Sequence, residues 1–207
     1  MFARMNRREF MQGMVGVGVA TRSAAEVPAG RGTVMTVRGP RPAGELGMVL
    51  PHEHVLVDFV GADEISPGRY DADAAYAKIK PFLDEFKALG GHTLVEATPA
   101  YLGRDPRLLV RLSEATGLHL ITNTGYYAAR QNKFLPAHAR TDDADALAAR
   151  WVREWERGLD GTGIKPGFIK IGMDAGPLSS EARKLVQAAA RTHRATGLTI
   201  AAHSGNQ

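Results

Sequence analysis

The sequence predicts an α/β fold in which strand–helix units repeat around a parallel sheet. Short apolar runs alternate with segments of helical spacing from residue 91 onward. The runs "TLVEA", "LITNT", "FIKIG" and "TIAAH" are apolar along most of their length, as expected for parallel strands buried on both faces. Their polar exceptions gather at the carboxyl ends, namely Glu96, Asn123, Lys170 and His203. Parallel strands end at one edge of a sheet, so these side chains should share one rim.

The first elements should be a hairpin, a strand and a helix. Residues 33–50 alternate between apolar and polar, with turns expected at Gly39-Pro40 and Ala43-Gly44, and lead into the strand that contains His52. Residues 72–89 have helical spacing and stop at Gly90-Gly91. Pro81 inside this segment predicts a kink or a break into two helices.

The rest of the chain should alternate strand and helix to its end. The helix after Asp105 should have that residue as its N-cap, Pro106 at its first position and Gly117 at its end. A helix capped by Ser179 or Ser180 should follow later. The strands expected are 92–99, 118–125, 167–174 and 198–205, and the helices are 105–117, 142–161 and 179–197.

Composition excludes several classes of protein. At 207 residues the chain can hold one sizeable core or form part of a larger domain. Four arginines and two glutamates lie in the first 29 residues, which leaves a net charge of only +2 for the rest. With no basic stripe interleaved with aromatics, a nucleic-acid binder is not expected. The absence of cysteine excludes disulfides, a thiolate nucleophile and Cys-ligated zinc.

The first 29 residues resemble an export signal. Arg7 and Arg8 are followed by Phe10 and by a weakly apolar run, residues 13–20, that is too short to span a bilayer. This pattern predicts a signal peptide of the twin-arginine (Tat) route and a periplasmic protein. The alternative is a disordered basic leader on a cytoplasmic protein, because Asn6 precedes the pair and no clean A-x-A cleavage site follows. In both cases the folded domain should begin at residue 30.

Two histidines in "GMVLPHEHVLVDF" are candidate metal ligands. In a strand, His52 and His54 would project from the same face, about 6.6 Å apart at their Cα atoms. With His203 on the same rim, three imidazoles would suffice for a zinc site with an open position. The alternative is that the histidines are satisfied core residues.

Lys170 is the unusual member of this group. An ammonium has no lone pair, so it cannot bind a metal, and burial of its charge within "FIKIG" would be unfavourable. Reaction of the neutral amine with carbon dioxide gives a carbamate, whose two oxygens could bridge two cations. The alternative is a lysine at a strand end whose amine reaches solvent.

These motifs, taken together, resemble those of a known family. "TVRGPRPAGELGMVLPHEHVLVDF", "GFIKIGMD" and "LTIAAHSG" resemble the phosphotriesterase family of the amidohydrolase superfamily, and the likeness runs in order from Thr33 to Gln207. The resemblance implies a distorted (β/α)8 TIM barrel with two divalent metals, usually zinc. It also implies hydrolysis of organophosphate triesters, lactones or related esters by a metal-activated water.

The resemblance also implies roles for individual residues. His52 and His54 match ligands of the more buried metal, His203 matches a ligand of the more exposed metal, and Lys170 matches the carboxylated lysine that bridges both. Tyr127 in "NTGYY" matches an aromatic residue near the metal-bound water that could position a substrate oxygen, although it could also anchor a loop. The expected partner is a small ester or lactone, with no nucleic acid and no membrane, and a homodimer is a further expectation for the full-length protein.

The family pattern continues past the fifth strand, with a further histidine ligand and a proton-shuttling aspartate. The sequence stops at Gln207, so about five of the eight βα units are expected here, as a truncated part of a longer enzyme. The fifth strand would then expose an edge and an apolar face. The alternatives are an inactive remnant, a non-catalytic metal-binding protein, and a generic binding module of βα units.

Overall fold

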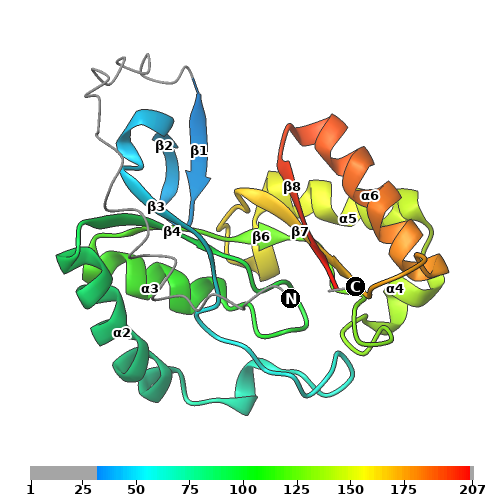
Figure 1. Ribbon diagram of the computed structural model, residues 1–207, viewed down its shortest axis with the longest axis horizontal. Helices are drawn as coiled ribbons and strands as arrows, with labels where there is room; N and C mark the ends of the chain where they lie inside the picture. Colours follow the sequence, from blue (N-terminus) through cyan, green and yellow to red (C-terminus); the bar gives the residue numbers. More distant parts are fainter. Residues whose placement is uncertain (1–31, 206–207) are drawn as a thin grey trace, which may run out of the picture. The chain divides into compact units, whose positions relative to one another are not determined.

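The computed structural model describes residues 32–205, and strands and helices alternate along them (Figure 1). The proposed Tat signal and the start of the domain at residue 30 lie outside this range, so both stay predictions. Among the described residues, no helix is both long and apolar enough to cross a membrane.

The chain begins with a hairpin of β1 (Thr33–Thr36) and β2 (Gly39–Pro42). Thr36 pairs with Gly39, so the turn lies at residues 37–38, and the prediction of a turn at Gly39-Pro40 was wrong. The Thr36 hydroxyl donates to the Gly39 carbonyl at 2.8 Å, which ties the two strand ends together. A 3-10 turn, η1 (Ala43–Glu45), occupies the second expected turn and leads into β3 (Met48–Glu53).

Two three-stranded parallel sheets follow the hairpin. In the first, β3 pairs with β4 (Gly91–Glu96) and β4 pairs with β5 (His119–Ile121). In the second, β6 (Asn123–Thr124) pairs with β7 (Phe168–Met173), which pairs with β8 (Thr199–Ser204). One residue, Thr122, separates β5 from β6, so the single strand expected at 118–125 carries the chain from one sheet to the other. The parallel α/β prediction is confirmed.

Four helices begin where the sequence supplies a cap. The side chains of Asp71, Asp105, Asp143 and Ser179 each accept a hydrogen bond from a backbone N–H in the first turn. The helices are α2 (Ala72–Ala88), α3 (Pro106–Thr116), α5 (Ala144–Arg157) and α6 (Ser180–Thr196). Helix α2 runs through Pro81, so a break into two helices was wrong.

Short helices also occur where loops were expected. Helix α4 (Ala137–Thr141) contains His138, and the 3-10 turns η2 (Pro67–Arg69) and η3 (Leu159–Gly161) follow β3 and α5 respectively. The long helix expected at 142–161 is therefore shorter, because α5 stops before Gly158.

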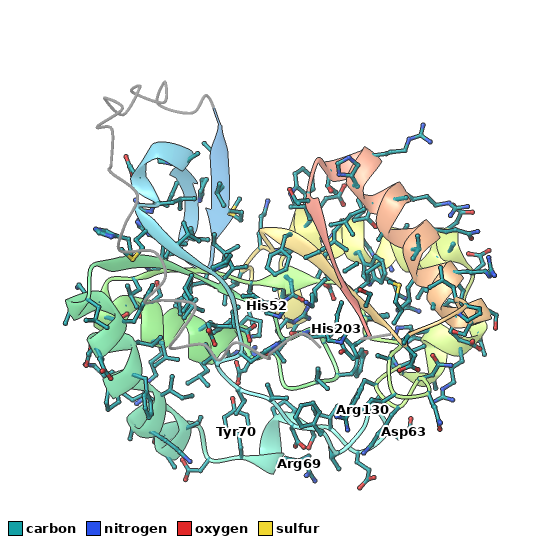
Figure 2. All side chains as sticks on the ribbon, in the orientation of Figure 1. His52, Asp63, Arg69, Tyr70, Arg130 and His203 are labelled. Atoms are coloured by element: carbon teal, nitrogen blue, oxygen red, sulfur yellow. The ribbon has the colours of Figure 1, made fainter. Side chains whose placement is uncertain are left out.

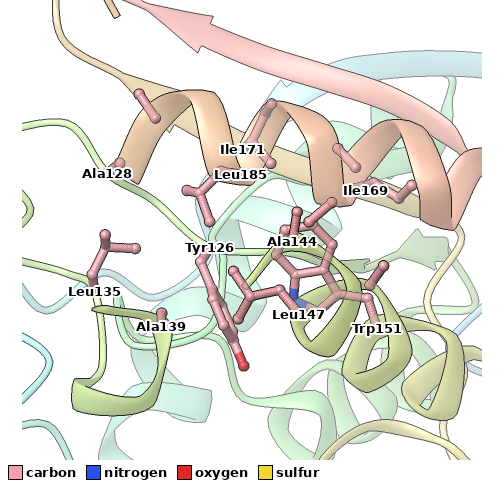
Figure 3. Close-up of a cluster of buried hydrophobic side chains, with 14 of the residues drawn as sticks. Tyr126, Ala128, Leu135, Ala139, Ala144, Leu147, Trp151, Ile169, Ile171 and Leu185 are labelled. Atoms are coloured by element: carbon pink, nitrogen blue, oxygen red, sulfur yellow. The ribbon is translucent and has the colours of Figure 1, made fainter. Parts of the chain in front are cut away.

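The two faces of β7 lie in different surroundings. Ile169 and Ile171 pack with Leu185 of α6 and with Leu147 and Trp151 of α5, which form the centre of the larger core cluster (Figure 3). Phe168 belongs instead to a small cluster with Ala97 and Ile121. Side chains alternate along a strand, so Lys170 lies on the face of Phe168 and away from the helices. A third cluster joins α2 and α3 to β4 and β5.

Candidate metal centre

His52 and His54 lie side by side at the carboxyl end of β3. Their ring centroids are 5.2 Å apart with an interplanar angle of 63°. Partial burial lowers the pKa of both imidazoles, and the positive charges of Lys170 and His203 lower it further. The four predicted ligand positions are therefore close enough for their charges to interact. Figure 2 shows His52 and His203 at the ends of β3 and β8.

Lys170 lies within β7 and is only 3% exposed. Burial lowers the pKa of its ammonium, and the Glu96 carboxylate opposes that shift only in part. A lysine in such a position has more of the neutral amine at neutral pH than an exposed lysine has. This is the form that reacts with carbon dioxide, so the surroundings of Lys170 suit the chemistry inferred from the sequence.

Tyr127 lies next to His203, with ring centroids 5.4 Å apart. Tyr127 forms an isolated parallel bridge with Gly172, and the following N–H, from Ala128, donates to the Gly172 carbonyl at 2.8 Å. A Cβ atom at position 172 would collide with the Tyr127 ring, so glycine is needed there. Burial raises the pKa of the phenol, which keeps Tyr127 protonated. Tyr127 therefore anchors its loop to β7 and also adjoins a predicted ligand.

Asp174, which follows β7, holds the loop after Tyr127. Its carboxylate accepts the N–H of Arg130 at 2.6 Å and that of Gln131 at 3.0 Å, and these two bonds lower the pKa of Asp174. Arg130, Gln131 and Asn132 all have φ between 57° and 63°, a left-handed conformation that is unfavourable for residues other than glycine. The contacts of Asp174 therefore stabilise a loop.

Sequence reasoning missed a hydrogen-bond network behind His54. The Nδ1 atom of His54 lies 2.9 Å from the hydroxyl oxygen of Thr98. Thr98 in turn contacts Glu96, a carboxyl that is 1% exposed and whose pKa is raised to about 7 by burial. Glu96 stood out in the sequence as a charged residue in an apolar strand, but no role followed from that. Thr98 gave no signal, because a threonine after a strand is common.

The donor types suit a divalent metal such as zinc, although the described residues do not by themselves complete a site. Within residues 32–205, no three His, Asp or Glu side chains converge closely enough to hold a metal ion. Imidazole nitrogens from His52, His54 and His203 are typical zinc donors, and the contact of His54 through Nδ1 leaves its Nε2 free. Completing the set would require Lys170 to contribute as an anion.

Two cavities in the described part of the chain lie mostly away from this rim. A cavity of about 360 Å³ lies among the loops after β3 and β4, beside Tyr70 and Arg104, and none of the five predicted site residues lines it. His54 lines a second cavity of about 270 Å³, together with residues of α2, β3 and β4. The side chains of His52, His54 and His203 are themselves exposed to solvent.

Comparison with known proteins points to one family. The model of the phosphotriesterase family matches residues 32–207. The "Phosphotriesterase homology protein" of Escherichia coli K12 is 33% identical over 76% of this chain and 52% of its own length. The human "N-acetyltaurine hydrolase" is 31% identical over 84% of this chain and 57% of its own length. The chain thus spans about half the length of the curated relatives it matches.

Solved structures of the same kind also match. The organophosphorus hydrolase from Deinococcus radiodurans is 34% identical, with a TM-score of 0.71 over 84% of this chain and 53% of that chain. The consecutive parallel strands, β3 to β8, therefore correspond to part of the TIM barrel of these enzymes. Residues 32–207 belong to the phosphotriesterase family.

Proposed function

We propose that the protein is a metal-dependent hydrolase that cleaves the ester bond of an organophosphate triester or a lactone. The observation that carries this proposal is a set of neighbouring side chains from three strands. The rings of His52 and His54 lie 5.2 Å apart, and Lys170 and His203 lie on the paired strands β7 and β8. After burial, the positive charges of Lys170 and His203 also lower the pKa of His52 and of His54. Membership of a family whose solved members include an organophosphorus hydrolase supports the reaction class.

The proposed ligands fall into two groups that share Lys170. His52 and His54 would hold one divalent ion, and His203 would hold the other, with Lys170 between them. When bound, the two ions, most simply zinc, supply Lewis acidity that lowers the pKa of a water molecule and polarises the phosphoryl or carbonyl oxygen of the substrate.

Lys170 would become a ligand by carboxylation. Its neutral amine nitrogen forms a bond to the carbon of carbon dioxide and loses one proton, which gives a carbamate with one negative charge and two oxygens. Burial at 3% exposure favours the neutral amine over the ammonium. Burial lowers the pKa of both histidines, and the positive charges of Lys170 and His203 lower it further; carboxylation would replace the charge of Lys170 with a negative one.

Tyr127 would position the substrate. Its phenol stays protonated because burial raises its pKa, so the hydroxyl can donate a hydrogen bond to a substrate oxygen. The ring is held against His203 and Gly172, which limits the positions that the hydroxyl can reach. Tyr127→Phe would remove this donor and leave the ring contacts in place.

Amide hydrolysis is a second candidate, and it rests on the human relative named N-acetyltaurine hydrolase. Attack on a carbonyl carbon is common to lactones and amides, so the same rim could serve either substrate. A binding role without catalysis, or an inactive remnant, is the remaining alternative.

The test is zinc-dependent hydrolysis of three substrates by the purified protein: an aryl dialkyl phosphate, an aliphatic lactone and N-acetyltaurine. Turnover of either ester should need zinc and disappear in His52→Ala. The control, His92→Ala, removes an exposed histidine near the opposite end of β4 and should leave the rate unchanged.

The outcomes distinguish an ester hydrolase, an amide hydrolase and a non-catalytic metal-binding protein. Zinc-dependent turnover of the amide alone would favour the second candidate. Zinc binding without turnover of any substrate would favour the non-catalytic alternative. Ester turnover that persists in His52→Ala would overturn the assignment of the site.

A further inference from the structure

We propose that Glu96 is a positioning residue that acts through Thr98 to fix the ring of His54, with the Nε2 atom of His54 left free to bind a metal. The inference rests on the proposed function, because it gives His54 a ligand's task. It concerns two residues of the loop side of β4 that the family resemblance did not assign. Three geometric observations support it.

The first observation is the contact between His54 and Thr98. The Nδ1 atom of His54 lies 2.9 Å from the Thr98 hydroxyl oxygen. Thr98 is fully buried, so few other partners can compete for its hydroxyl group. The hydrogen bond spans 44 residues of sequence and joins the end of β3 to the end of β4. It therefore fixes the orientation of a ring that is otherwise exposed to solvent.

The second observation is that the carboxyl group of Glu96 holds Thr98 in place. Glu96 Oε1 accepts the N–H of Thr98 at 3.1 Å and that of Val55 at 3.3 Å. The first of these bonds fixes the backbone of Thr98, whose hydroxyl oxygen lies against His54. For Nε2 of His54 to be free for a metal, Nδ1 must carry the proton and donate it to the Thr98 hydroxyl oxygen. The positioning role therefore predicts the tautomer whose lone pair lies on Nε2.

The third observation is that further hydrogen bonds hold the backbone on either side of the contact between His54 and Thr98. Val55 directly follows His54, so Glu96 also holds the backbone next to that residue. On the other side, the amide nitrogen of the buried Asn123 donates to the carbonyl oxygens of Glu96 and Thr98, at 3.0 Å each. The segment 96–98 thus has little freedom to move relative to β6.

The burial of the Glu96 carboxyl group makes folding less favourable, so stability does not explain its presence. Glu96 Oε2 has no hydrogen-bond partner in the part of the chain that the structure describes. Burial of an unpaired polar atom destabilises a protein, whereas an apolar side chain in a buried strand would not. This carboxyl group accepts the backbone N–H of Thr98, the residue whose hydroxyl group contacts His54, and this placement is consistent with a role in the site.

The test measures both the tautomer of His54 and the affinity for zinc. Long-range ¹H–¹⁵N NMR of the metal-free chain, labelled at histidine, should show Nδ1–H for His54 when the imidazoles are neutral. Thr98→Val removes the hydroxyl with little change of shape, so it should shift His54 toward Nε2–H and weaken zinc binding about 10- to 100-fold. Glu96→Gln should shift the tautomer and weaken zinc binding in the same direction. Thr98→Ser keeps the hydroxyl group, so its tautomer and zinc affinity should match those of the unaltered chain.

The matched control is Thr93→Val. Thr93 is as buried as Thr98 but lies within β4, near the end opposite to Thr98, and donates to the Leu46 carbonyl at 2.5 Å. Its loss should leave the tautomer and the zinc affinity as they are. If Thr98→Val fails to fold by circular dichroism, Glu96→Gln decides, because it is isosteric.

Two results separate this inference from the proposed function. If the chain binds zinc and neither Thr98→Val nor Glu96→Gln changes the tautomer or the affinity, Glu96 has no positioning role and the metal site stands. If the chain binds no zinc but the tautomer shifts as expected, the orientation of His54 by Glu96 stands and the proposed function fails. Detection of Nε2–H for His54 in the unaltered chain would overturn the positioning role directly.

Discussion

Charged side chains inside apolar strands carry the functional information of this chain. Lys170 and Glu96 are 3% and 1% exposed, and both interrupt strands that would be more stable without a charge. The sequence showed both interruptions, because each stands out against apolar neighbours. It could not show that Thr98 joins Glu96 to His54, because that contact depends on how two distant strand ends meet.

Glu96 should make the stability of the protein depend on pH. Its pKa is about 7 in the folded chain, above its ordinary value of 4.5, so the unfolded chain loses this proton first. The stabilising contribution of the protonated form is complete below about pH 4.5 and is lost as the pH rises through 7. Glu96→Gln cannot ionise, so its stability relative to the unaltered chain should rise between pH 5 and pH 8, by roughly 3 kcal/mol at most.

Urea denaturation at a series of pH values measures this difference. Glu114→Gln, an exposed position on α3, serves as the control and should follow the pH profile of the unaltered chain. Identical profiles for Glu96→Gln and Glu114→Gln would show that Glu96 has an ordinary pKa in the folded chain.

At the scale of elements, the sequence predicted those helix ends that are determined by residues next to them in the chain. The caps of α3, Asp105 and Gly117, were expected from the sequence and have the expected geometry, with Gly117 at φ 76°. Elements determined by distant contacts were missed. The short helix α4 is not among the helices expected from the sequence; it contains His138, whose Nε2 atom is 2.9 Å from the Tyr126 hydroxyl oxygen.

The interruption between β5 and β6 has a similar origin. The Thr122 carbonyl accepts the N–H of Gly167 at 2.8 Å, and Gly167 approaches Ile121 and the Met35 backbone too closely for any larger residue. A residue that lies more than forty positions away in the sequence thus helps to define where the strand is divided. No periodicity within 118–125 carries that information.

Pro81 supplies a prediction at the same scale. It lies on an exposed position inside α2 and removes the N–H that would bond to the Ala77 carbonyl. Pro81→Ala should restore this bond and stabilise the chain by up to about 3 kcal/mol, as measured by urea denaturation. Pro67→Ala, at the first position of η2, should change stability by less than about 0.5 kcal/mol. A loss of stability in Pro81→Ala would mean that Leu83 packs correctly only when proline shapes the helix.

At the scale of the whole domain, β3 and β8, each at the edge of a parallel sheet, carry exposed apolar side chains. Met48 and Val49 of β3 are 57% and 40% exposed, and Ile200 of β8 is 36% exposed. The sequence predicted this feature for the fifth strand, and β8 fits that description. Unpaired edges with apolar side chains promote association between chains.

The 207-residue chain should therefore self-associate as its concentration rises. Sedimentation velocity should show an increasing weight-average mass, and the double variant Val49→Lys, Ile200→Lys should reduce it, because charge on an edge strand opposes pairing. Lys substitution at the exposed helix position Ala77 is the control and should have no such effect. A chain that stays monomeric at every concentration would contradict this account of the edges.

The most direct test of the central claim is zinc titration of the chain and of Lys170→Ala, by competition with a chromogenic chelator. If Lys170 joins His52, His54 and His203 in one site, Lys170→Ala should lose zinc binding, and short carboxylic acids should partly restore it by replacing the missing anion. Lys78→Ala, an exposed lysine on α2, should bind zinc like the unaltered chain. Equal zinc stoichiometry and affinity in Lys170→Ala would contradict the claim that this lysine completes the metal centre.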